Sequence, residues 1–227
     1  MAGKVAVVTG FPYGYCQNSE VINLTNPREK STFIASTSEC CDCTGAVIED
    51  QVLICGGKCY GDFYQEYFFL KNPEEKLQML EKRKWPSSIV LDKSKLWIVG
   101  GENLNSTEFI SIAQNPVKGP DLPFTVFSHT LVKYNSSTIY IIGGFQDGYI
   151  SNETWIINPK KAFQIRRGPP LNVERCRHSS GVMKINGKSI IVVAGGAGGN
   201  EAGFTVELLD PTSNKGWIIG MQIDMNP

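Results

Sequence analysis

The sequence predicts an all-β fold built from repeated units of four antiparallel strands, and three features of the chain carry that prediction. Short apolar runs that end in a diglycine recur at residues 52–57, 96–101, 139–144 and 191–196. The second glycines of these runs are 44, 43 and 52 residues apart. Further strand patterns flank each run. A period of roughly 40 to 50 residues with four short strands is typical of propeller blades rather than of helical solenoids.

The clearest repeat covers residues 138–159, TIYIIGGFQDGYISNETWIINP. Its run at 139–142 is short, β-branched and wholly apolar, which suits a strand buried on both faces. The diglycine ends this strand because glycine adopts backbone angles that other residues avoid. A polar loop then leads to a second strand at 154–157, which an Asn-Pro pair terminates.

The other repeats show the same order of elements. Each diglycine run is preceded by a hairpin arm, at 45–48, 88–91, 130–134 and 181–185. Each run is followed by a third strand, at 66–70, 108–112, 154–157 and 205–209. A fainter outer strand is predicted at 162–166 and 216–219, whereas the one near Val117 is barely recognisable.

These features resemble the kelch repeat, in which a diglycine closes the second strand and a tryptophan often leads toward a Gly-Pro pair. Trp155 and the RGPP segment at 167–170 fit that pattern, as do GPDLP at 119–123 and RCRH at 175–178. The resemblance covers nearly the whole chain and implies a kelch-type β-propeller of four-stranded antiparallel blades. It departs in the first unit, where Thr9-Gly10 stands in place of the diglycine.

We expect one propeller domain with about five blades. The blades are predicted at 1–39 (partial), 40–85, 86–127, 128–173 and 174–221, within a domain of residues 1–227. The first blade lacks its innermost hairpin arm, and the tail at 221–227 stops where another hairpin would begin. Because the resemblance implies a ring of about six or seven blades, we expect the ring to be incomplete.

The first residues also resemble the start of a short-chain dehydrogenase, with a strand that runs into a glycine loop. Tyr67 and Lys71 even show the Tyr-x-x-x-Lys spacing of that family. However, Cys16 stands where the last glycine of the loop belongs, and no helical periodicity follows. A single glycine match is weak, so nucleotide binding remains a remote alternative to a first blade with strands at 5–9 and 20–24.

The charged segment at 72–83, NPEEKLQMLEKR, allows two interpretations. Its position in the repeat favours a short strand near residues 77–80, protected by charged neighbours. Its Glu and Lys content would also suit a helix.

The chain has seven cysteines, most of them near the start of the second unit: Cys16, Cys40, Cys41, Cys43, Cys55, Cys59 and Cys176. Cys43 and Cys55 lie on the two arms of one predicted hairpin, so we predict a disulfide between them. Buried free thiols and a zinc site at the Cys-x-Cys and Cys-x-x-x-Cys spacings are the alternatives. Seven is odd, and Cys176 is the candidate for the unpaired thiol.

Four Asn-x-Ser/Thr triplets are candidate glycosylation sites: Asn23, Asn105, Asn135 and Asn152. Together with the cysteines they favour an oxidising, extracellular or secreted setting, similar to that of secreted kelch-repeat proteins. The first residues do not have the pattern of a signal peptide, so a cytoplasmic location is the alternative.

The two histidines, His129 and His178, occupy equivalent places before successive hairpins. Two histidines could bind a metal, as in copper oxidases with a kelch-like propeller, but their periodic placement favours blade-entrance positions that bond to strand ends. Trp85, Trp97, Trp155 and Trp217 lie in or beside strands, which favours packing between sheets.

Composition sets limits on the function. Lys plus Arg and Asp plus Glu both number 22, so no global field favours binding to nucleic acid. No apolar run approaches the roughly 20 residues of a membrane span. Because no catalytic set, metal cluster or phosphate loop is evident, we expect no cofactor, no bound metal and no catalytic residue.

The sequence therefore favours a non-enzymatic, kelch-repeat protein-binding module. Its binding surface is predicted in the variable loops after the diglycines, because loops on a rigid scaffold commonly carry recognition. The aromatic residues of these loops are the candidates: Tyr60, Phe63, Phe145 and Tyr149. A carbohydrate-active or oxidase-like enzyme on the same fold is the alternative.

Overall fold

The structure, a computed structural model, describes residues 4–8, 18–23, 32–35, 42–59, 62–112, 114–199 and 202–222. Contacts divide the chain into two compact units. Unit 1 comprises residues 1–102 and 107–119, and unit 2 comprises 103–106 and 120–227. In the described parts of both units almost every regular element is a strand, and the one exception is a 3-10 turn, η1 (Ala202–Phe204).

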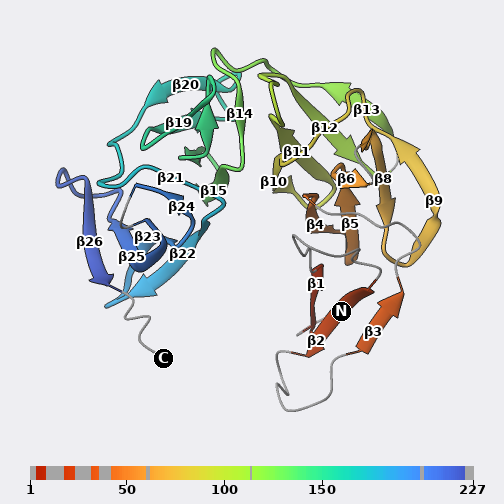
Figure 1. Cartoon of the computed structure of the whole chain (residues 1–227), viewed down its shortest axis with the longest axis horizontal. Helices are drawn as coiled ribbons and strands as arrows, with labels where there is room; N and C mark the ends of the chain where they lie inside the picture. The colour runs from red at the N-terminus through yellow and green to blue at the C-terminus, as the bar shows by residue number, and fades with distance from the viewer. Residues whose placement is uncertain are drawn as a thin grey trace. The chain divides into compact units, whose positions relative to one another are not determined.

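Unit 1 contains antiparallel sheets that follow the chain in order (Figure 1). The first sheet has the order β1 (Lys4–Val8), β2 (Asn18–Asn23), β3 (Thr32–Ala35). The second has the order β4 (Thr44–Ile48), β5 (Gln51–Cys55), β8 (Glu66–Phe69), β9 (Asn72–Gln78). The third has the order β10 (Ser87–Asp92), β11 (Lys95–Val99), β12 (Thr107–Ser111), β13 (Gln114–Lys118). A small ribbon joins β6 (Lys58–Cys59) to β7 (Asp62–Phe63).

Unit 2 repeats the same four-stranded pattern twice. The β15–β20 sheet has the order β15 (Thr130–Asn135), β16 (Thr138–Ile142), β19 (Thr154–Asn158), β20 (Gln164–Arg167). The β22–β26 sheet has the order β22 (Ser179–Ile185), β23 (Lys188–Ala194), β25 (Thr205–Leu209), β26 (Trp217–Gln222). Short ribbons join β14 (Val126–Phe127), β17 (Phe145–Gln146) and β18 (Tyr149–Ile150), and β21 (Arg175–Cys176) pairs with β24 (Ala197–Gly198).

These sheets confirm the predicted all-β class and its four-stranded antiparallel, propeller-like units. The second strands β5, β11 and β16 are largely buried, as their apolar composition requires. In β16, Ile139, Ile141 and Ile142 are completely buried. The two sheets of unit 2 pack face to face through one core that contains Tyr140, Ile142, Ile191, Val193, Leu209 and Trp217.

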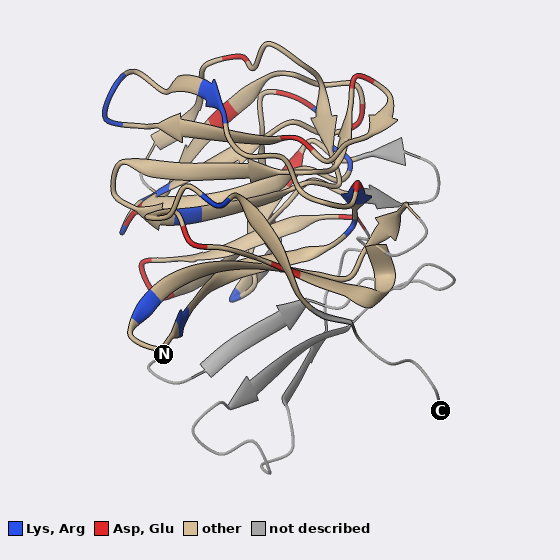
Figure 2. Ribbon diagram, turned by 90° about the vertical axis from the view of Figure 1, so that its left-hand side faces the viewer, with Lys and Arg blue, Asp and Glu red and all other residues tan. Residues whose placement is uncertain are grey.

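Charged residues of both signs are interspersed along the strands and turns (Figure 2). The described residues include no helix that is long and apolar enough to cross a membrane.

Two alternatives from the sequence are wrong. The segment at 72–83 is not a helix: its first part forms strand β9, with Glu66 opposite Gln78 in the ladder to β8. The strand is thus real but lies earlier than the predicted residues 77–80. The dehydrogenase alternative requires a parallel sheet with helices, whereas every described sheet is antiparallel. Tyr67 of the apparent Tyr-x-x-x-Lys motif is a buried strand residue opposite Cys55. Residues 9–17, with Cys16, lie outside the described part of the chain.

The predicted disulfide between Cys43 and Cys55 is not formed, because Cys55 is a free, buried thiol. The hairpin pairs Thr44, not Cys43, with Cys55. Cys43 therefore packs beside Ile54 and Phe68, while Cys55 belongs to the cluster on the other face of the sheet. Burial raises the pKa of the Cys55 thiol well above its usual value. Cys40 and Cys41 lie outside the described residues, and Cys59 lies in β6.

The diglycines end the second strands in a conformation that only glycine adopts readily. Gly143 and Gly144 have φ angles of +55° and +88°. Space is restricted as well, since a Cβ atom on Gly144 would lie 2.6 Å from the Cβ of His129. Both constraints explain why the pair recurs at the end of this strand.

We predict that Gly144→Ala destabilises the protein more than Gly148→Ala. Gly148 has a φ of +90°, almost that of Gly144, but nothing lies within 4 Å of a Cβ placed there. The control therefore carries only the backbone strain of about 1–2 kcal/mol, whereas Gly144→Ala adds about 1–3 kcal/mol of overpacking. Urea unfolding of the two variants measures the difference in unfolding free energy. Equal losses in the two variants would contradict a contribution from crowding at Gly144.

Candidate functional site

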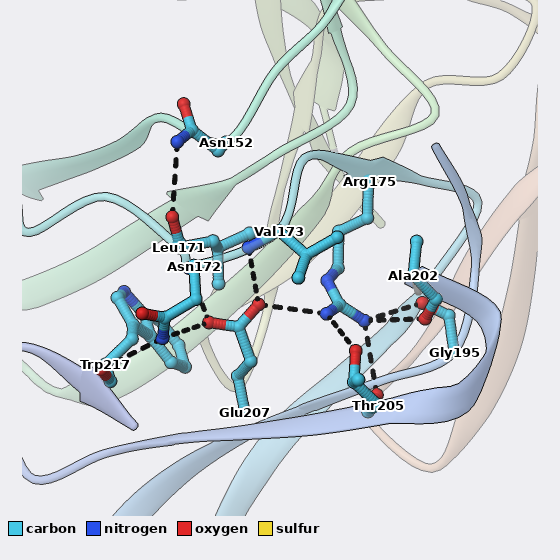
Figure 3. Close-up of polar contacts among 10 residues, drawn as sticks. All are labelled: Asn152, Leu171, Asn172, Val173, Arg175, Gly195, Ala202, Thr205, Glu207 and Trp217. Carbon is cyan, nitrogen blue, oxygen red and sulfur yellow. Dashed lines mark hydrogen bonds and ion pairs between the residues drawn. The ribbon is translucent and has the colours of Figure 1, made fainter. Parts of the chain in front are cut away.

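A buried ion pair fixes the loop before the β22–β26 sheet to the third strand of that sheet (Figure 3). The Nη2 atom of Arg175 lies 2.9 Å from Oε1 of Glu207, and both side chains are completely buried. Arg175 also donates through Nη1 to the carbonyl oxygens of Gly195 and Ala202, at 2.9 and 3.0 Å. The guanidinium thus joins the loop, the diglycine and the third strand.

Glu207 is in turn held by the segment that leads into this loop. Its Oε2 accepts from the backbone N and from Nδ2 of Asn172, at 2.6 and 2.9 Å. Its Oε1 also accepts from the backbone N of Val173, at 3.1 Å. Several donors therefore compensate the desolvation of this carboxylate, as a buried ion pair requires.

Unit 1 contains the same arrangement in its β10–β13 sheet. The Nε atom of Arg83 donates to Oε1 of Glu108 at 2.6 Å, and Nη1 donates to the carbonyl of Gly100 at 2.7 Å. Gly100 and Gly195 are both the first glycine of a diglycine. The Arg-Glu pair is therefore shared by these two sheets and has a structural role. In the β4–β9 sheet Phe68, opposite Ile54, takes the position of the glutamate.

The β15–β20 sheet departs from this arrangement. Trp155 lies opposite Ile141 in the ladder, the position that Glu207 takes opposite Val193. Val126 of β14 stands where Arg175 stands in β21, since each begins the ribbon strand before its sheet. The buried ion pair is thus replaced by apolar residues in this sheet.

Gln146 takes over the hydrogen bonds of the missing pair. Its Nε2 donates to the carbonyl of Gly143, the first glycine of this diglycine, at 3.1 Å. Its Oε1 accepts from the indole Nε1 of Trp155 at 3.0 Å. A neutral bridge from the loop hairpin therefore takes the place of the charged bridge seen in the β10–β13 and β22–β26 sheets.

An open pocket of about 410 Å³ lies beside this bridge, within unit 2. Its lining combines aromatic, charged and amide side chains: Pro123, Phe124, Gln146, Asp147, Tyr149, Ile150, Ser151, Asn152, Glu153, Trp155 and Arg167. The rings of Phe124 and Trp155 stack with their centroids 4.7 Å apart. The guanidinium of Arg167 lies 5.1 Å from the Trp155 ring and forms an ion pair of 3.0 Å with Glu153.

A tight hairpin forms one side of the pocket. Asp147 and Gly148 both have positive φ, of +48° and +90°, as a two-residue turn between β17 and β18 requires. Asp147 Oδ1 accepts from the N and Oγ1 of Thr125, at 2.9 and 3.2 Å, and the N of Asp147 donates to the carbonyl of Thr125. The turn is therefore fixed, and it presents Tyr149 with 79% of its surface exposed.

Only part of this site was predicted from the sequence. Tyr149 lies at the pocket, as a loop aromatic available for binding. Phe145, in contrast, is half-buried and stacks on Phe127 with a centroid distance of 4.7 Å. Tyr60 lies outside the described residues, and Phe63 lies in β7. Phe124 and Arg167 were not predicted, and Trp155 was assigned to packing between sheets.

Two of the predicted glycosylation sites hold equivalent structural positions. The Nδ2 of Asn105 donates to the carbonyl of Leu122 at 2.9 Å, and the Nδ2 of Asn152 donates to that of Leu171 at 3.2 Å. Asn135 caps an exposed hairpin tip, where its Oδ1 accepts from Ser137. Asn23 is the last residue of β2. Glycosylation of the four stays a prediction.

The histidines hold equivalent positions against the second glycines. A Cβ on Gly144 or Gly196 would meet the Cβ of His129 or His178, at 2.6 and 2.9 Å. Burial, and then the charge of His178, lowers the pKa of His129 to about 3. Burial, and then Arg175, lowers the pKa of His178 to about 4. No group of three or more His, Cys, Asp or Glu suited to a metal ion occurs among the described residues.

The comparisons with known proteins support the fold. No family model matches the sequence, and no curated protein matches it either. Among solved structures, the one named "Structure of YjhT" is similar, with a TM-score of 0.78 and 13% sequence identity. The match covers 98% of this chain and 82% of that one. At this identity the likeness shows a propeller-like fold and nothing about activity.

We predict that Glu207→Gln costs about 3–5 kcal/mol of unfolding free energy, because it leaves the buried Arg175 cation without its counter-charge. Glu153→Gln is the matched control, because it removes the ion pair with Arg167, whose side chain is 71% exposed. An exposed pair contributes about 0–1 kcal/mol. Chemical unfolding of both variants checks this, and a small loss in Glu207→Gln would show that the pair is dispensable.

We also predict that stability falls as the pH is lowered from about 7 toward 4. The folded histidines have pKa values of about 3 and about 4, below the usual 6.5, so the unfolded chain binds more protons in this window. The stabilisation by the neutral histidines is fully present above about pH 6.5 and is lost as the pH falls toward the folded pKa values. Each unit of difference between the unfolded and folded pKa of a histidine is equivalent to about 1.4 kcal/mol. In a His129→Gln/His178→Gln variant, the unfolding free energy should depend less on pH than in the native protein. An unchanged pH dependence would contradict the assignment to these histidines.

Proposed function

We propose that this protein is a kelch-type, non-enzymatic binding module that recognises a protein partner through the pocket beside Trp155 and the hairpin that carries Tyr149. The observation that supports the proposal most is the neutral bridge of this sheet with the open pocket beside it, at a place where two other sheets bury an Arg-Glu pair.

The chemical character of the pocket suits a protein surface. Tyrosine, tryptophan and arginine are enriched at interface hot spots, and here Tyr149, Trp155 and Arg167 line one open depression. The stacked Phe124 and Trp155 rings give it an apolar wall, and charged groups surround that wall. A hydrophobic centre with a polar rim is the usual anatomy of an interface.

Preorganisation also favours recognition by the hairpin. Asp147 is bonded to Thr125 on one side, and Gln146 is bonded to Gly143 and Trp155 on the other. A hairpin held at both ends loses little conformational entropy when a partner binds. The exposed Tyr149 ring can thus contribute its full contact area.

The secreted setting belongs to this proposal, and the triplet at Asn135, on an exposed hairpin tip, is its best support.

We predict that Tyr149→Ala weakens partner binding at least tenfold, as expected for a hot-spot aromatic, and leaves the melting temperature nearly unchanged. Peptides selected on the native protein from a displayed random library provide the ligand, and binding is measured by titration. Phe204→Ala is the matched control, because Phe204 is another exposed aromatic of unit 2, on η1.

Loss of binding in Tyr149→Ala but not in Phe204→Ala supports the proposal. Equal binding by both variants, or selection of no peptide at all, would overturn it. A large drop in melting temperature with unaltered binding would assign Tyr149 to packing and remove this hairpin from the site.

A further inference from the structure

The chain's own Arg167 shows how the pocket holds a cation. Its guanidinium lies over the Trp155 ring at 5.1 Å and forms an ion pair with Glu153 at 3.0 Å. Arg167 lies opposite Trp155 in the ladder between β19 and β20, which places it at the pocket. An aromatic face combined with a carboxylate is the usual receptor for a guanidinium group.

Arg167 is held only weakly in that position. Its side chain is 71% exposed and that of Glu153 is 33% exposed. Exposed ion pairs add little stability, because water solvates both charges well and two long side chains must be ordered. An incoming cation can therefore take the place of Arg167 at small cost, while Arg167 moves into solvent.

The rest of the lining also favours a cation. The pocket has two carboxylates, Asp147 and Glu153, against the one guanidinium of Arg167. Asp147 uses Oδ1 for Thr125, and its Oδ2 has no hydrogen bond to any described residue. With Arg167 displaced, the pocket presents two carboxylates and the faces of Tyr149 and Trp155.

We propose that the pocket receives a basic side chain of the partner, an arginine in preference to a lysine, which displaces Arg167 from Trp155 and Glu153. This inference rests on the proposed function and specifies the chemistry of that same site. Arginine is preferred because its planar guanidinium stacks on a ring and pairs with a carboxylate through two N–H groups. Arg167 then acts as an internal competitor for the site.

The opposite hypothesis assigns Arg167 to the partner. In that case the ligand is a carboxylate, and Arg167 binds it directly. The two hypotheses predict opposite effects of removing Arg167, so one substitution separates them. Arg167→Gln keeps a long polar side chain and removes only the charge.

The test is a titration of native protein and variants with N-acetyl-arginine amide, N-acetyl-citrulline amide and N-acetyl-glutamate amide. The readout is the NMR signal of the Trp155 indole N–H, which donates to Gln146 at the pocket and so reports local binding. We expect the arginine probe to shift this signal and the uncharged citrulline probe to shift it much less. Arg167→Gln should bind the arginine probe roughly three- to fivefold more tightly, the effect of one exposed ion pair.

Two further variants complete the design. Glu153→Gln should weaken binding of the arginine probe, because it removes one of the two acceptors. Lys188→Gln is the matched control, since Lys188 is an exposed lysine in an ion pair with Asp210, on the neighbouring sheet. Lys188→Gln should leave the affinity for the arginine probe unchanged, which would exclude a general effect of net charge.

Each other outcome overturns the inference. If Arg167→Gln abolishes binding of the glutamate probe, the site takes an acidic group. If no form of the protein binds the arginine probe up to its solubility limit, the site takes no basic side chain. In both cases the proposed function stands if Tyr149→Ala still loses the selected peptides, and it falls separately if Tyr149→Ala keeps them.

Discussion

The buried Arg-Glu pair is the interaction on which two of the four-stranded sheets, β10–β13 and β22–β26, depend most. In each of two sheets an arginine from the incoming loop reaches the first glycine of the diglycine and a glutamate on the third strand. Removing two charges from water is expensive, and the attraction between them compensates only when further hydrogen bonds satisfy both groups. The chain meets that condition at the glutamates with backbone donors, such as Leu80 for Glu108 and Val173 for Glu207.

The diglycines make these contacts possible. A positive φ at the first glycine turns the chain at the end of the second strand, and its carbonyl then accepts from the arginine. The missing Cβ of the second glycine leaves space for the incoming histidine, as at Gly196 and His178. Backbone geometry, ion pair and loop path are thus one connected arrangement, which explains why the glycines mark the repeat so clearly in the sequence.

Much of the fold could be predicted because it repeats. Apolar runs before diglycines predicted the second strands, and their spacing predicted the flanking strands, including the outer strand near Val117, which forms as β13. The register of the strand pairs was harder to predict. The hairpin turn at Glu49 and Asp50 pairs Ile48 with Gln51, so Thr44 faces Cys55. A difference of one residue moves a side chain to the other face of a sheet, and the predicted disulfide was wrong for that reason.

The pocket was harder to predict because the repeat pattern shows what the sheets have in common, whereas the pocket depends on how one sheet differs. Trp155 matches the tryptophan of the repeat pattern, and this suggested packing. Alignment of the repeats on the second glycine places Trp155 with Glu207, both 11 residues after it, and Val126 with Arg83, both 18 residues before it. Glu108 and Arg175 are offset by loops of other lengths, so their equivalence required the strand ladders of the structure. The hydrogen bonds of Gln146 depend on the conformation of the hairpin and required the structure.

A sheet that replaces a buried contact found in two other sheets gives a physical reason to look for function there. In those two sheets a buried ion pair ties the loop to the third strand and fills the space between them with side chains that are committed to each other. The neutral bridge from Gln146 to Trp155 makes the same tie and leaves the Trp155 ring to stack with Phe124 and Arg167. Because the β22–β26 sheet of the same unit keeps its ion pair and Gln146 supplies the hydrogen bonds in this sheet, the replacement need not cost unit 2 its stability. The departure therefore frees an aromatic surface at a rigid position, which is what recognition requires.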